Sequence, residues 1–379
     1  MKLTIDRDVF LENLNIVSRG LPSKTSMPSL YGIKMDVTSQ NMFLTTSNMD
    51  ISIEVMIEDK SLNIEEPGKC LINGKFFIDI IRKVNSKKVI LQLLDDNQLY
   101  IKVDRGEYKL RVMNYEDYPS IDFVTLENPL SLETSLIKSI IRETGFATAK
   151  SEKRPIFTGV NFKLVNNELT CVGTDSYRLA QKKINLNDSY NDFNIVIPSK
   201  SLDELLKIID NNDETINVYF ESNKVLFKYN NVMFQTRLID GQFPDTQRVI
   251  PTSYLATLKF NKDDLVQAIE RVSIVSPHDT EKNRELTYST VKLNISKNQN
   301  IEISTSNSQV GDAKEEVIAN EIDAAEEFQI GFNSEYMLDA LRSFTDYEII
   351  IELSGNVKPF VVKGTNTTNL LQIILPVNL

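Results

Sequence analysis

The chain has 379 residues, of which 41% are hydrophobic and 25% are charged, and this composition excludes an intrinsically disordered protein. No segment approaches the roughly 18 consecutive apolar residues of a transmembrane helix, so a helical membrane protein is excluded as well. The net charge of −11 argues against a nucleic-acid partner without excluding one, since phosphate affinity normally comes from an excess of lysine and arginine. The net charge is an average over the whole surface. A protein that surrounds its nucleic acid needs only a modestly basic inner surface, and its outer surface can stay acidic.

The start of the chain and its cysteines predict a soluble, cytoplasmic protein. Residues 1–10 alternate charged and apolar side chains and lack the long apolar stretch of a signal peptide. Cys70 and Cys171 are far apart in sequence and belong to no C-x-x-C pair. This usage is typical of a reducing compartment, where a free cysteine serves as a small buried hydrophobic residue.

The first predicted helix follows a short alternating stretch at the start of the chain, and the same pattern recurs twice. The three stretches begin at Leu3, Leu130 and Leu258, and each is followed by an apolar i, i+4 pair on one helix face. The pairs are Phe10 with Leu14, Ile137 with Ile141, and Leu265 with Ile269, at successive spacings of 127 and 128 residues. Asp6 and Asn261 stand where helix N-caps belong.

A second helix is predicted in each copy, beginning near Asn73, Ser199 and Asn333, which are plausible N-cap residues. Runs of β-prone residues lie between the helices, separated by turn-forming strings such as 95–97 and 166–167. The runs cover residues 51–57, 89–94, 99–103, 216–220, 225–229 and 301–304. Two helices with several antiparallel strands predict an α+β unit in which the helices cover one face of the sheet.

The repeat predicts three tandem domains of one fold, at residues 1–125, 126–254 and 255–379. Residues 115–120 and 241–245 end the first two copies, and each segment places an aromatic residue ahead of a proline, which favours an extended chain. The alternative is that similar hydrophobic patterns arose by chance in an ordinary α+β protein. The common offset of several positions favours the repeat.

Motifs for catalysis are absent from the sequence. The single histidine, His278, lies in the loop-like string S-P-H-D without a cysteine or serine constellation. The chain has no phosphate-binding G-x-x-x-x-G-K-[ST] motif, no G-x-G-x-x-G motif and no His or Cys cluster with metal-ligand spacing. Its 53 acidic residues fall mostly in charge-mixed helices and acidic loops, which are usually solvated. We therefore predict a protein that is not an enzyme and that needs neither a cofactor nor a metal.

Several motifs in order resemble one family. The string T-D-S-Y-R-L-A at residues 174–180 resembles the T-D-[GS]-[HY]-R-L-A signature of the bacterial sliding clamps, the β subunit of DNA polymerase III. The resemblance covers the whole chain, and it includes residues 1–5, the F-P-D string within 241–251, the G-F-N string at 331–333 and the C-terminal L-P-V-N-L. One departure is Asn378, where clamps often carry an arginine.

The resemblance implies a head-to-tail homodimer in which six similar domains form a closed ring. Helices would line the hole, duplex DNA would pass through it without sequence-specific contacts, and the acidic exterior would repel DNA from the rim. Such a ring confers processivity by tethering the replicative polymerase, the clamp loader and other replication and repair proteins through short apolar linear motifs.

The resemblance also implies a groove that accepts extended peptides. Carried over position by position, the groove consists of Phe157, Thr174, Tyr177, Arg178, Leu179, Pro244, Arg248, Val249, Asn333, Tyr336, Val357, Pro359, Ile374, Leu375, Pro376 and Val377. The apolar members could line a pocket, and Arg178 and Arg248 could bind a peptide carbonyl or carboxylate. Without the resemblance, the apolar members would be read as ordinary core residues.

The resemblance implies two further surfaces. Residues expected to face DNA are Arg19, Lys24, Lys75, Arg82, Lys150, Lys153, Arg154 and Lys207, although each could be an ordinary solvated charge. Residues expected at the ring-closing interface are Lys75, Tyr108, Leu110, Ile274, Val275, Glu315 and Glu316. There the edge strand 107–110 would meet the region of Ile274, and Lys75 would pair with the acidic stretch.

Two other classes of function stay open on sequence grounds. A monomeric multidomain scaffold would bind protein partners without encircling DNA, and it predicts one subunit in solution and no retention on circular DNA. A hydrolase with an acidic site of unfamiliar pattern would depend on individual carboxylates, which carboxylate variants and a substrate screen would reveal.

Overall fold

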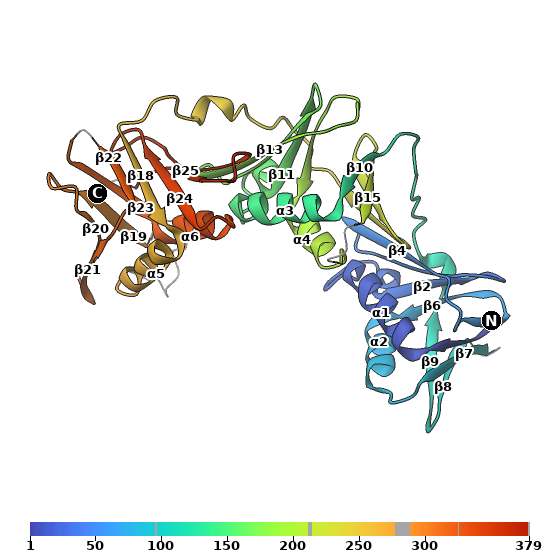
Figure 1. The fold of residues 1–379 in the computed structure, drawn as a ribbon. Coiled ribbons are helices and arrows are strands. Elements are labelled where there is room, and N and C mark those ends of the chain that lie inside the picture. Colours follow the sequence, from blue (N-terminus) through green and yellow to red (C-terminus); the bar gives the residue numbers. More distant parts are fainter. Residues whose placement is uncertain (95–96, 211–213, 277–288, 325, 378–379) are drawn as a thin grey trace. The chain divides into compact units, whose positions relative to one another are not determined.

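The computed structural model describes residues 1–94, 97–210, 214–276, 289–324 and 326–377 (Figure 1). The chain divides into two compact units, Met1–Ile137 with Lys200–Leu238, and Lys138–Ser199 with Ile239–Leu379. The division passes through the middle repeat, so that each unit contains one terminal repeat and part of the middle one. No helix among the described residues is both long and apolar enough to cross a membrane.

The first unit is built on an antiparallel sheet of 13 strands, in the order β10-β15-β16-β17-β4-β3-β2-β6-β9-β8-β7-β1-β5. Its strands are β1 (Lys2–Asp6), β2 (Gly32–Val37), β3 (Met42–Ser47), β4 (Ile51–Ile57), β5 (Asn63–Glu66), β6 (Gly68–Asn73), β7 (Lys88–Leu94), β8 (Gln98–Val103), β9 (Gly106–Met113), β10 (Leu130–Glu133), β15 (Thr215–Phe220), β16 (Lys224–Tyr229) and β17 (Val232–Arg237).

The second unit contains a sheet of nine strands, in the order β14-β11-β12-β13-β26-β25-β24-β18-β22, and a sheet of four, β21-β20-β19-β23. The nine are β11 (Gly159–Val165), β12 (Glu168–Thr174), β13 (Arg178–Asn185), β14 (Phe193–Pro198), β18 (Ala256–Asn261), β22 (Glu321–Ala324), β24 (Glu348–Leu353), β25 (Phe360–Gly364) and β26 (Leu370–Ile374). The four are β19 (Thr290–Ile295), β20 (Ile301–Asn307), β21 (Gly311–Val317) and β23 (Phe328–Asn333).

Six α-helices occur in the described residues, two in each repeat, as the sequence predicts. They are α1 (Arg7–Val17), α2 (Gly74–Lys83), α3 (Thr134–Thr144), α4 (Ser199–Leu206), α5 (Lys262–Ser273) and α6 (Ser334–Arg342). The predicted N-caps Asp6, Asn73, Asn261 and Asn333 each accept a hydrogen bond from a backbone N–H of the first turn. Ser199 instead lies inside α4 as its first residue.

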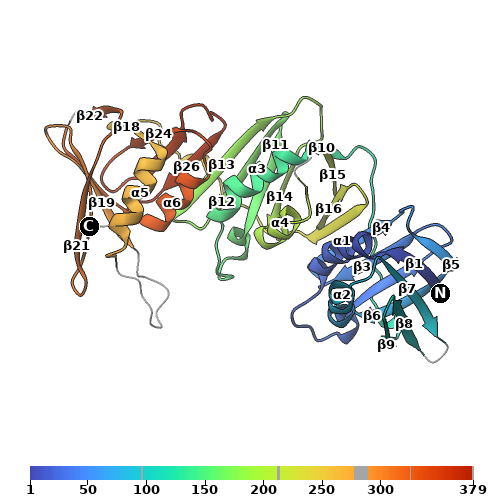
Figure 2. The same cartoon turned by 60° about the horizontal axis from the view of Figure 1, so that its bottom comes forward.

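Each terminal repeat forms a helix pair packed on its sheet, as Figures 1 and 2 show for α1 with α2 and for α5 with α6. Between α1 and α2, the rings of Phe10 and Phe77 meet edge to face with centroids 5.7 Å apart. In the third repeat, α5 and α6 enclose a buried core that includes Phe260, Phe332 and Phe360. The predicted α+β class, with helices covering one sheet face, is confirmed.

Successive repeats are joined by strand pairing within each unit. In the first unit β17 of the middle repeat pairs with β4, and in the second unit β26 of the third repeat pairs with β13. Both pairings are antiparallel, and each extends one repeat's sheet with a strand of the next. The backbone groups of these strands are therefore satisfied in the sheet ladder across the repeat boundary.

Candidate functional site

A tight turn at residues 174–178, between β12 and β13, positions the residues of the signature motif. The carboxylate of Asp175 accepts hydrogen bonds from the backbone N–H groups of Tyr177 and Arg178, at 2.9 and 3.0 Å. The hydroxyl of Thr174 donates to the carbonyl of Arg178 at 2.6 Å. Ser176 has a φ of 78°, which lies in the left-handed region that favours glycine. The turn leaves the side chain of Tyr177 exposed to solvent.

Arg178 is only 6% exposed, and its guanidinium is held by three hydrogen-bond acceptors and one aromatic ring. Its Nε lies 3.1 Å from the carboxylate of Asp175, and its Nη1 lies 2.6 Å from that of Asp339 on α6. Its Nη2 donates to the carbonyl of Phe146 at 2.8 Å, and its guanidinium lies 4.4 Å from the ring centroid of Tyr336. Arg178 thus links the turn to α6 and fixes the ring of Tyr336.

A buried apolar cluster lies beneath this turn. It contains Val172, Leu179, Val196, Phe243, Val361 and Ile373. The β13–β26 register places Leu179 opposite Ile373, so the two repeats contribute side chains to one cluster. The ring of the half-buried Phe157 meets Phe243 edge to face, at 6.1 Å between centroids. These residues form an apolar floor that no single repeat could provide.

The C-terminal segment is tied to both repeats by backbone hydrogen bonds. The N–H of Leu375 donates to the carbonyl of Tyr177 at 2.9 Å, and the N–H of Val377 donates to the carbonyl of Gly331 at 2.8 Å. Leu375 is exposed, whereas Pro376 and Val377 are half-buried. The tail therefore presents an apolar side chain beside the exposed Tyr177. Asn378 lies outside the described residues.

The rim of this region carries exposed side chains from two loops. Val249 ends the short 3₁₀ helix Gln247–Val249, and Val357 lies in the β24–β25 loop next to the half-buried Pro359. Phe360 pairs with Ile374, which brings the end of that loop to the C-terminal segment. Pro244 and Arg248 are also exposed, and Arg248 forms an ion pair with Asp245 at 3.3 Å.

Several expected groove residues lie below the surface. Asn333 is buried and caps α6, Ile374 belongs to the core of the third repeat, and Thr174 supports the turn. Sequence reasoning missed Asp175, Asp339, Phe146 and Phe243, which hold Arg178 or the apolar floor. Asp175 lies inside the motif and could have been proposed as the acceptor within the turn. Phe146 and Asp339 carry no local signal, because their contacts depend on distant strands.

The expected DNA-facing residues include five that are exposed and three for which an ion pair is observed. Lys24, Lys75, Lys150, Lys153 and Arg154 are exposed. Arg19 lies 3.2 Å from Glu204, Lys207 lies 2.6 Å from the same carboxylate, and Arg82 lies 3.2 Å from Asp79. These carboxylates partly neutralise the charges of Arg19, Lys207 and Arg82.

The expected ring-closing residues lie on exposed edges. Tyr108 is exposed on β9, where residues 106–111 pair with β8 alone among the described strands. Ile274 is exposed after α5, and β21, with Glu315 and Glu316, is the last strand of the four-stranded sheet. Glu315 accepts a hydrogen bond from Nε of Arg271 at 3.0 Å. An ion pair between Lys75 and Glu315 would therefore compete with Arg271.

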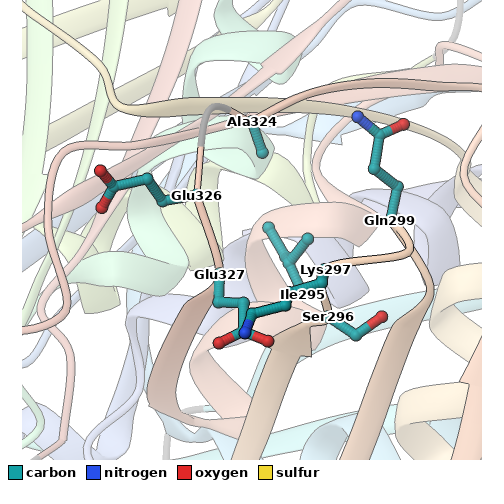
Figure 3. A pocket seen from close by; sticks show the side chains of 7 residues that line it. All are labelled: Ile295, Ser296, Lys297, Gln299, Ala324, Glu326 and Glu327. Carbon is teal, nitrogen blue, oxygen red and sulfur yellow. The ribbon is translucent and has the colours of Figure 1, made fainter.

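A separate cavity of about 580 Å³ lies at the end of β19 (Figure 3). It is lined by Ile295, Ser296, Lys297, Gln299, Ala324, Glu326 and Glu327. None of the expected site residues lines it, and its mixed charges give no preference for one ligand charge. No group of three potential metal ligands occurs in the described part of the chain, and His278 lies outside that part.

Repeated helix-pair domains joined by sheet pairing, with an apolar surface at the second junction, define the class of DNA sliding clamps. The chain belongs to the DNA polymerase III beta subunit family, whose N-terminal, central and C-terminal domain models match residues 1–122, 131–245 and 247–378. Beta sliding clamps of Staphylococcus epidermidis and Staphylococcus aureus are each 37% identical over 100% of this chain and 99% of their own length.

Solved structures agree with this membership. The DNA polymerase sliding clamp of Bacillus subtilis matches with a TM-score of 0.94 and 35% identity, over 100% of this chain and 99% of that one. The DNA polymerase III beta chain of Streptococcus pneumoniae matches with the same TM-score and identity, over 100% of both chains. The resemblance that the signature motif predicted is confirmed across the whole sequence.

Proposed function

We propose that this protein encircles duplex DNA as a sliding clamp and tethers the replicative DNA polymerase and other replication and repair proteins to it. The observation that carries the proposal is the match of all three clamp domains, in order, along one chain. Processivity then arises from topology, because a closed ring cannot leave an intact duplex sideways however weak its contacts are.

A head-to-tail homodimer completes the ring in this proposal. Each protomer contributes three repeats, and a heterologous contact that closes after two copies gives a ring and not a filament. The exposed β9 edge and the exposed β21 edge support such a contact, because unpaired strand edges are available for pairing with another chain. Ring opening at such a joint leaves the remaining sheets intact.

The DNA contacts are proposed to be weak and sequence-independent. Lys24, Lys75, Lys150, Lys153 and Arg154 can approach phosphates, which carry no sequence information. The net charge of −11 per chain keeps DNA away from the outside and makes the lined hole the favourable place. Contacts of this kind allow the ring to slide.

The apolar surface around Tyr177 and Leu375 is the proposed docking site for partner peptides. Its buried floor of Leu179, Phe243 and Ile373 and its exposed rim suit an extended peptide with a few apolar anchors. A clamp of Bartonella birtlesii, 27% identical, was solved with griselimycin bound, so relatives of this chain do accept ligands. Arg178 shapes the surface instead of offering its main donors to the peptide.

Three further expectations accompany this function, and they concern catalysis, location in the cell and domain boundaries. The chain has no catalytic role of its own in the proposal, and it acts in the cytoplasm, where the chromosome is replicated. The domain boundaries are proposed near residues 125 and 254, and the limits of the family-model matches support them.

The test of this function is retention of the loaded protein on nicked circular plasmid at high salt, before and after the plasmid is linearised. A ring stays on the circle and slides off the linear form. Equal loss from both forms would leave only electrostatic binding, which salt weakens, and would favour the monomeric scaffold.

A further inference from the structure

The chain joins its repeats at two strand junctions that are built in the same way. At the first junction β17 of the middle repeat pairs with β4 of the first repeat, and at the second β26 of the third repeat pairs with β13 of the middle repeat. Both junctions lie within one chain, so their residues can be matched position by position. The side chains between the strands and the helices nevertheless differ in chemistry between the two junctions.

The strand that is added at each junction supplies Phe234 at the first and Gln372 at the second. Their equivalence follows from the strand ladders of the two repeats, which start at the matched residues Leu130 and Leu258. The ladder of the middle repeat runs through Leu130, Val218, Phe227 and Phe234, and that of the third repeat runs through Leu258, Ile351, Val362 and Gln372. Phe234 and Gln372 are each only 1% exposed, so both belong to the buried part of their junction.

The receiving strands β4 and β13, like the helices α1 and α3, are related by an offset of 127 residues. The hairpin ladders agree with this offset, since they run through Met35, Leu44 and Val55 in the first repeat and through Phe162, Cys171 and Lys182 in the middle repeat. The junctions agree as well, because Phe234 faces Ile53 and Gln372 faces Ala180. Three equivalent pairs matter below, namely Thr46 with Gly173, Val55 with Lys182, and Ile16 with Glu143.

At the second junction the amide of Gln372 reaches both helices that border it. Its Nε2 donates to the carbonyl of Glu143 in the last turn of α3, at 3.1 Å, and to the hydroxyl of Ser343 at the C-terminal end of α6, at 3.0 Å. The carbonyls of a helix's last turn have no partner inside the helix, so this amide satisfies one of them from the next repeat. Gln372 therefore links α3 of the middle repeat to α6 of its own repeat.

At the first junction the matching helix end is satisfied without the added strand. The hydroxyl of Thr46 on β3 donates to the carbonyl of Val17, the last residue of α1, at 2.5 Å. Gly173 replaces Thr46 in the middle repeat, and a β-carbon there would lie 2.2 Å from the carbonyl oxygen of Thr144, the last residue of α3. The middle repeat therefore has no room for a capping side chain at this position.

The positions around the two matched side chains differ in the same sense. Ile208 and Ser343 each stand nine residues after the first residue of α4 or α6. The first junction thus carries Val55, Ile16 and Ile208 where the second carries Lys182, Glu143 and Ser343. The ring of Phe234 meets that of Phe227 edge to face, at 6.2 Å between centroids. The first junction is apolar at the positions where the second is polar.

A buried ion pair completes the polar side of the second junction. Nζ of Lys182 lies 2.5 Å from the carboxylate of Glu143, and Lys182 is only 6% exposed. Burial raises the pKa of Glu143 even though its bond to Lys182 acts in the opposite direction. Desolvation therefore outweighs the attraction for this carboxylate, and the pair adds little stability over apolar packing. Its polarity instead distinguishes β13 from β4.

We infer that Gln372 is a pairing-specificity residue, which directs β26 to β13 and away from the equivalent strand β4. On β4 the amide of Gln372 would be buried beside Val55 and Ile16 without an acceptor, which destabilises that pairing. On β13, Phe234 in its place would leave the carbonyl of Glu143 without this donor. The inference is independent of the proposed ring, because both junctions lie inside one protomer. Wrong association of similar domains is a characteristic failure of repeat proteins.

Mispairing is detected by a disulfide that the native pairing does not allow. Leu371 faces Gln181 and Glu54 faces Met233 in the native junctions. If β26 were added to β4 in the register of β17, Leu371 would face Glu54 instead. A chain with Glu54→Cys and Leu371→Cys therefore forms a link between these two positions when β26 pairs with the wrong strand, within one chain or between two copies.

The test uses the full chain, refolded from urea under oxidising conditions, with Cys70→Ala and Cys171→Ala to remove the native thiols. We expect Gln372→Met to raise the linked fraction by about fivefold or more, because methionine keeps the shape of the side chain and loses the donor. Gln372→Phe, which copies Phe234, should raise it further. The linked fraction is measured by mass spectrometry of the digested protein.

Leu370→Ala is the matched control. Leu370 is buried on the same strand and the same face as Gln372, so its truncation lowers stability without changing the polar match. We expect its linked fraction to stay at the level of the unaltered chain. An equal rise in Leu370→Ala and Gln372→Met, or no rise in Gln372→Met, would overturn the inference and leave Gln372 a merely structural residue.

A second pair of cysteines covers variants that do not reach the native fold. Asn369→Cys replaces Leu371→Cys, so that the thiol moves two residues along the chain on the same side of the strand. Random collisions in a misfolded chain would link Glu54→Cys to either position, whereas β26 paired with β4 links it to Leu371→Cys. An excess of the Leu371→Cys link in the Gln372 variants supports the inference, and equal links at both positions would overturn it.

Discussion

At the scale of single residues, Arg178 determines the shape of the peptide-docking surface without being much exposed itself. Its guanidinium joins the turn of β13 to Asp339 of α6, and it stacks against Tyr336. A planar side chain with five donors suits this task, because the compact ammonium of a lysine could not reach the three separate acceptors and lie against the ring at the same time. The ring of Tyr336 and the backbone of Tyr177 are therefore placed by one buried cation.

Replacing Asp339 by asparagine should loosen this arrangement and weaken peptide binding. The Asp339→Asn variant loses the charge-assisted bond to Arg178 at 2.6 Å but keeps the size of the side chain. We expect the affinity for an apolar motif peptide to fall by about three- to tenfold, measured by fluorescence anisotropy. Asp79→Asn, at the same position of α2, is the matched control and should leave affinity unchanged. An unaltered affinity in the Asp339→Asn variant would rule out a positioning role.

Some residues of the peptide-docking surface could be predicted from the sequence, and others could not. Tyr177, Leu179, Leu375 and Val377 follow from the motifs at 174–180 and 375–379, which are contiguous strings. Asp339 and Phe243 could not be predicted, because they meet Arg178 and Phe157 only through pairing of distant strands. The burial of Asn333 and Ile374 could not be predicted from the sequence for the same reason, because it depends on which strands and helices pack over these residues.

At the scale of elements, the β25–β26 hairpin is held by one buried carboxylate. Asp346 precedes β24 and accepts hydrogen bonds from the backbone N–H groups of Asn366 and Thr367, at 2.6 and 3.0 Å, and from the Thr367 hydroxyl. Burial alone would raise the pKa of Asp346, but these bonds outweigh it and the pKa is lowered. Because β26 pairs with β13, this loop supports the strand that joins the second and third repeats.

The Asp346→Asn variant should lose stability in a pH-dependent way. A carboxyl group with a lowered folded pKa stabilises the fold above its unfolded pKa of about 3.9, and that stabilisation disappears as the pH falls through the folded value. The variant should be less stable than the wild type by about 1–3 kcal/mol at pH 7, and the gap should narrow below about pH 4. Urea unfolding at several pH values measures it, with the exposed Asp263→Asn as control. A gap that does not depend on pH would contradict the assignment.

The helices were more predictable than the strand pairing. Four helices begin directly after an N-cap residue that is visible in the local sequence, namely Asp6, Asn73, Asn261 or Asn333. The apolar i, i+4 pairs of the first helices also recur at nearly constant spacing along the chain. The strand β4 was predicted with its observed bounds. Short strands such as β5 and β22 were missed, since four mostly exposed residues carry little hydrophobic pattern. The pairing of β17 with β4 links residues far apart in sequence, and no local propensity encodes it.

At the scale of the whole molecule, retention of the proposed clamp on DNA depends on closure of the ring and not on the strength of its DNA contacts. The acidic exterior and the small number of exposed basic side chains expected at the DNA disfavour tight binding, so retention must depend on closure. Partner binding is separate from closure, because the docking surface belongs to the β13–β26 junction and the closing edges belong to β9 and β21. Variants at one location should therefore leave the other function intact.

Removal of residues 375–379 tests this separation directly. The deletion removes the exposed Leu375 and the bond from the Val377 N–H to Gly331, but it leaves β26 and its pairing with β13 in place. We expect loss of polymerase stimulation in a primer-extension assay, because the apolar tail is part of the docking surface. Dimerisation and retention on nicked circular plasmid should remain at the level of the full chain. Stimulation that survived the deletion would place the docking site elsewhere, whereas loss of the ring as well would mean that the tail also supports the third repeat's fold.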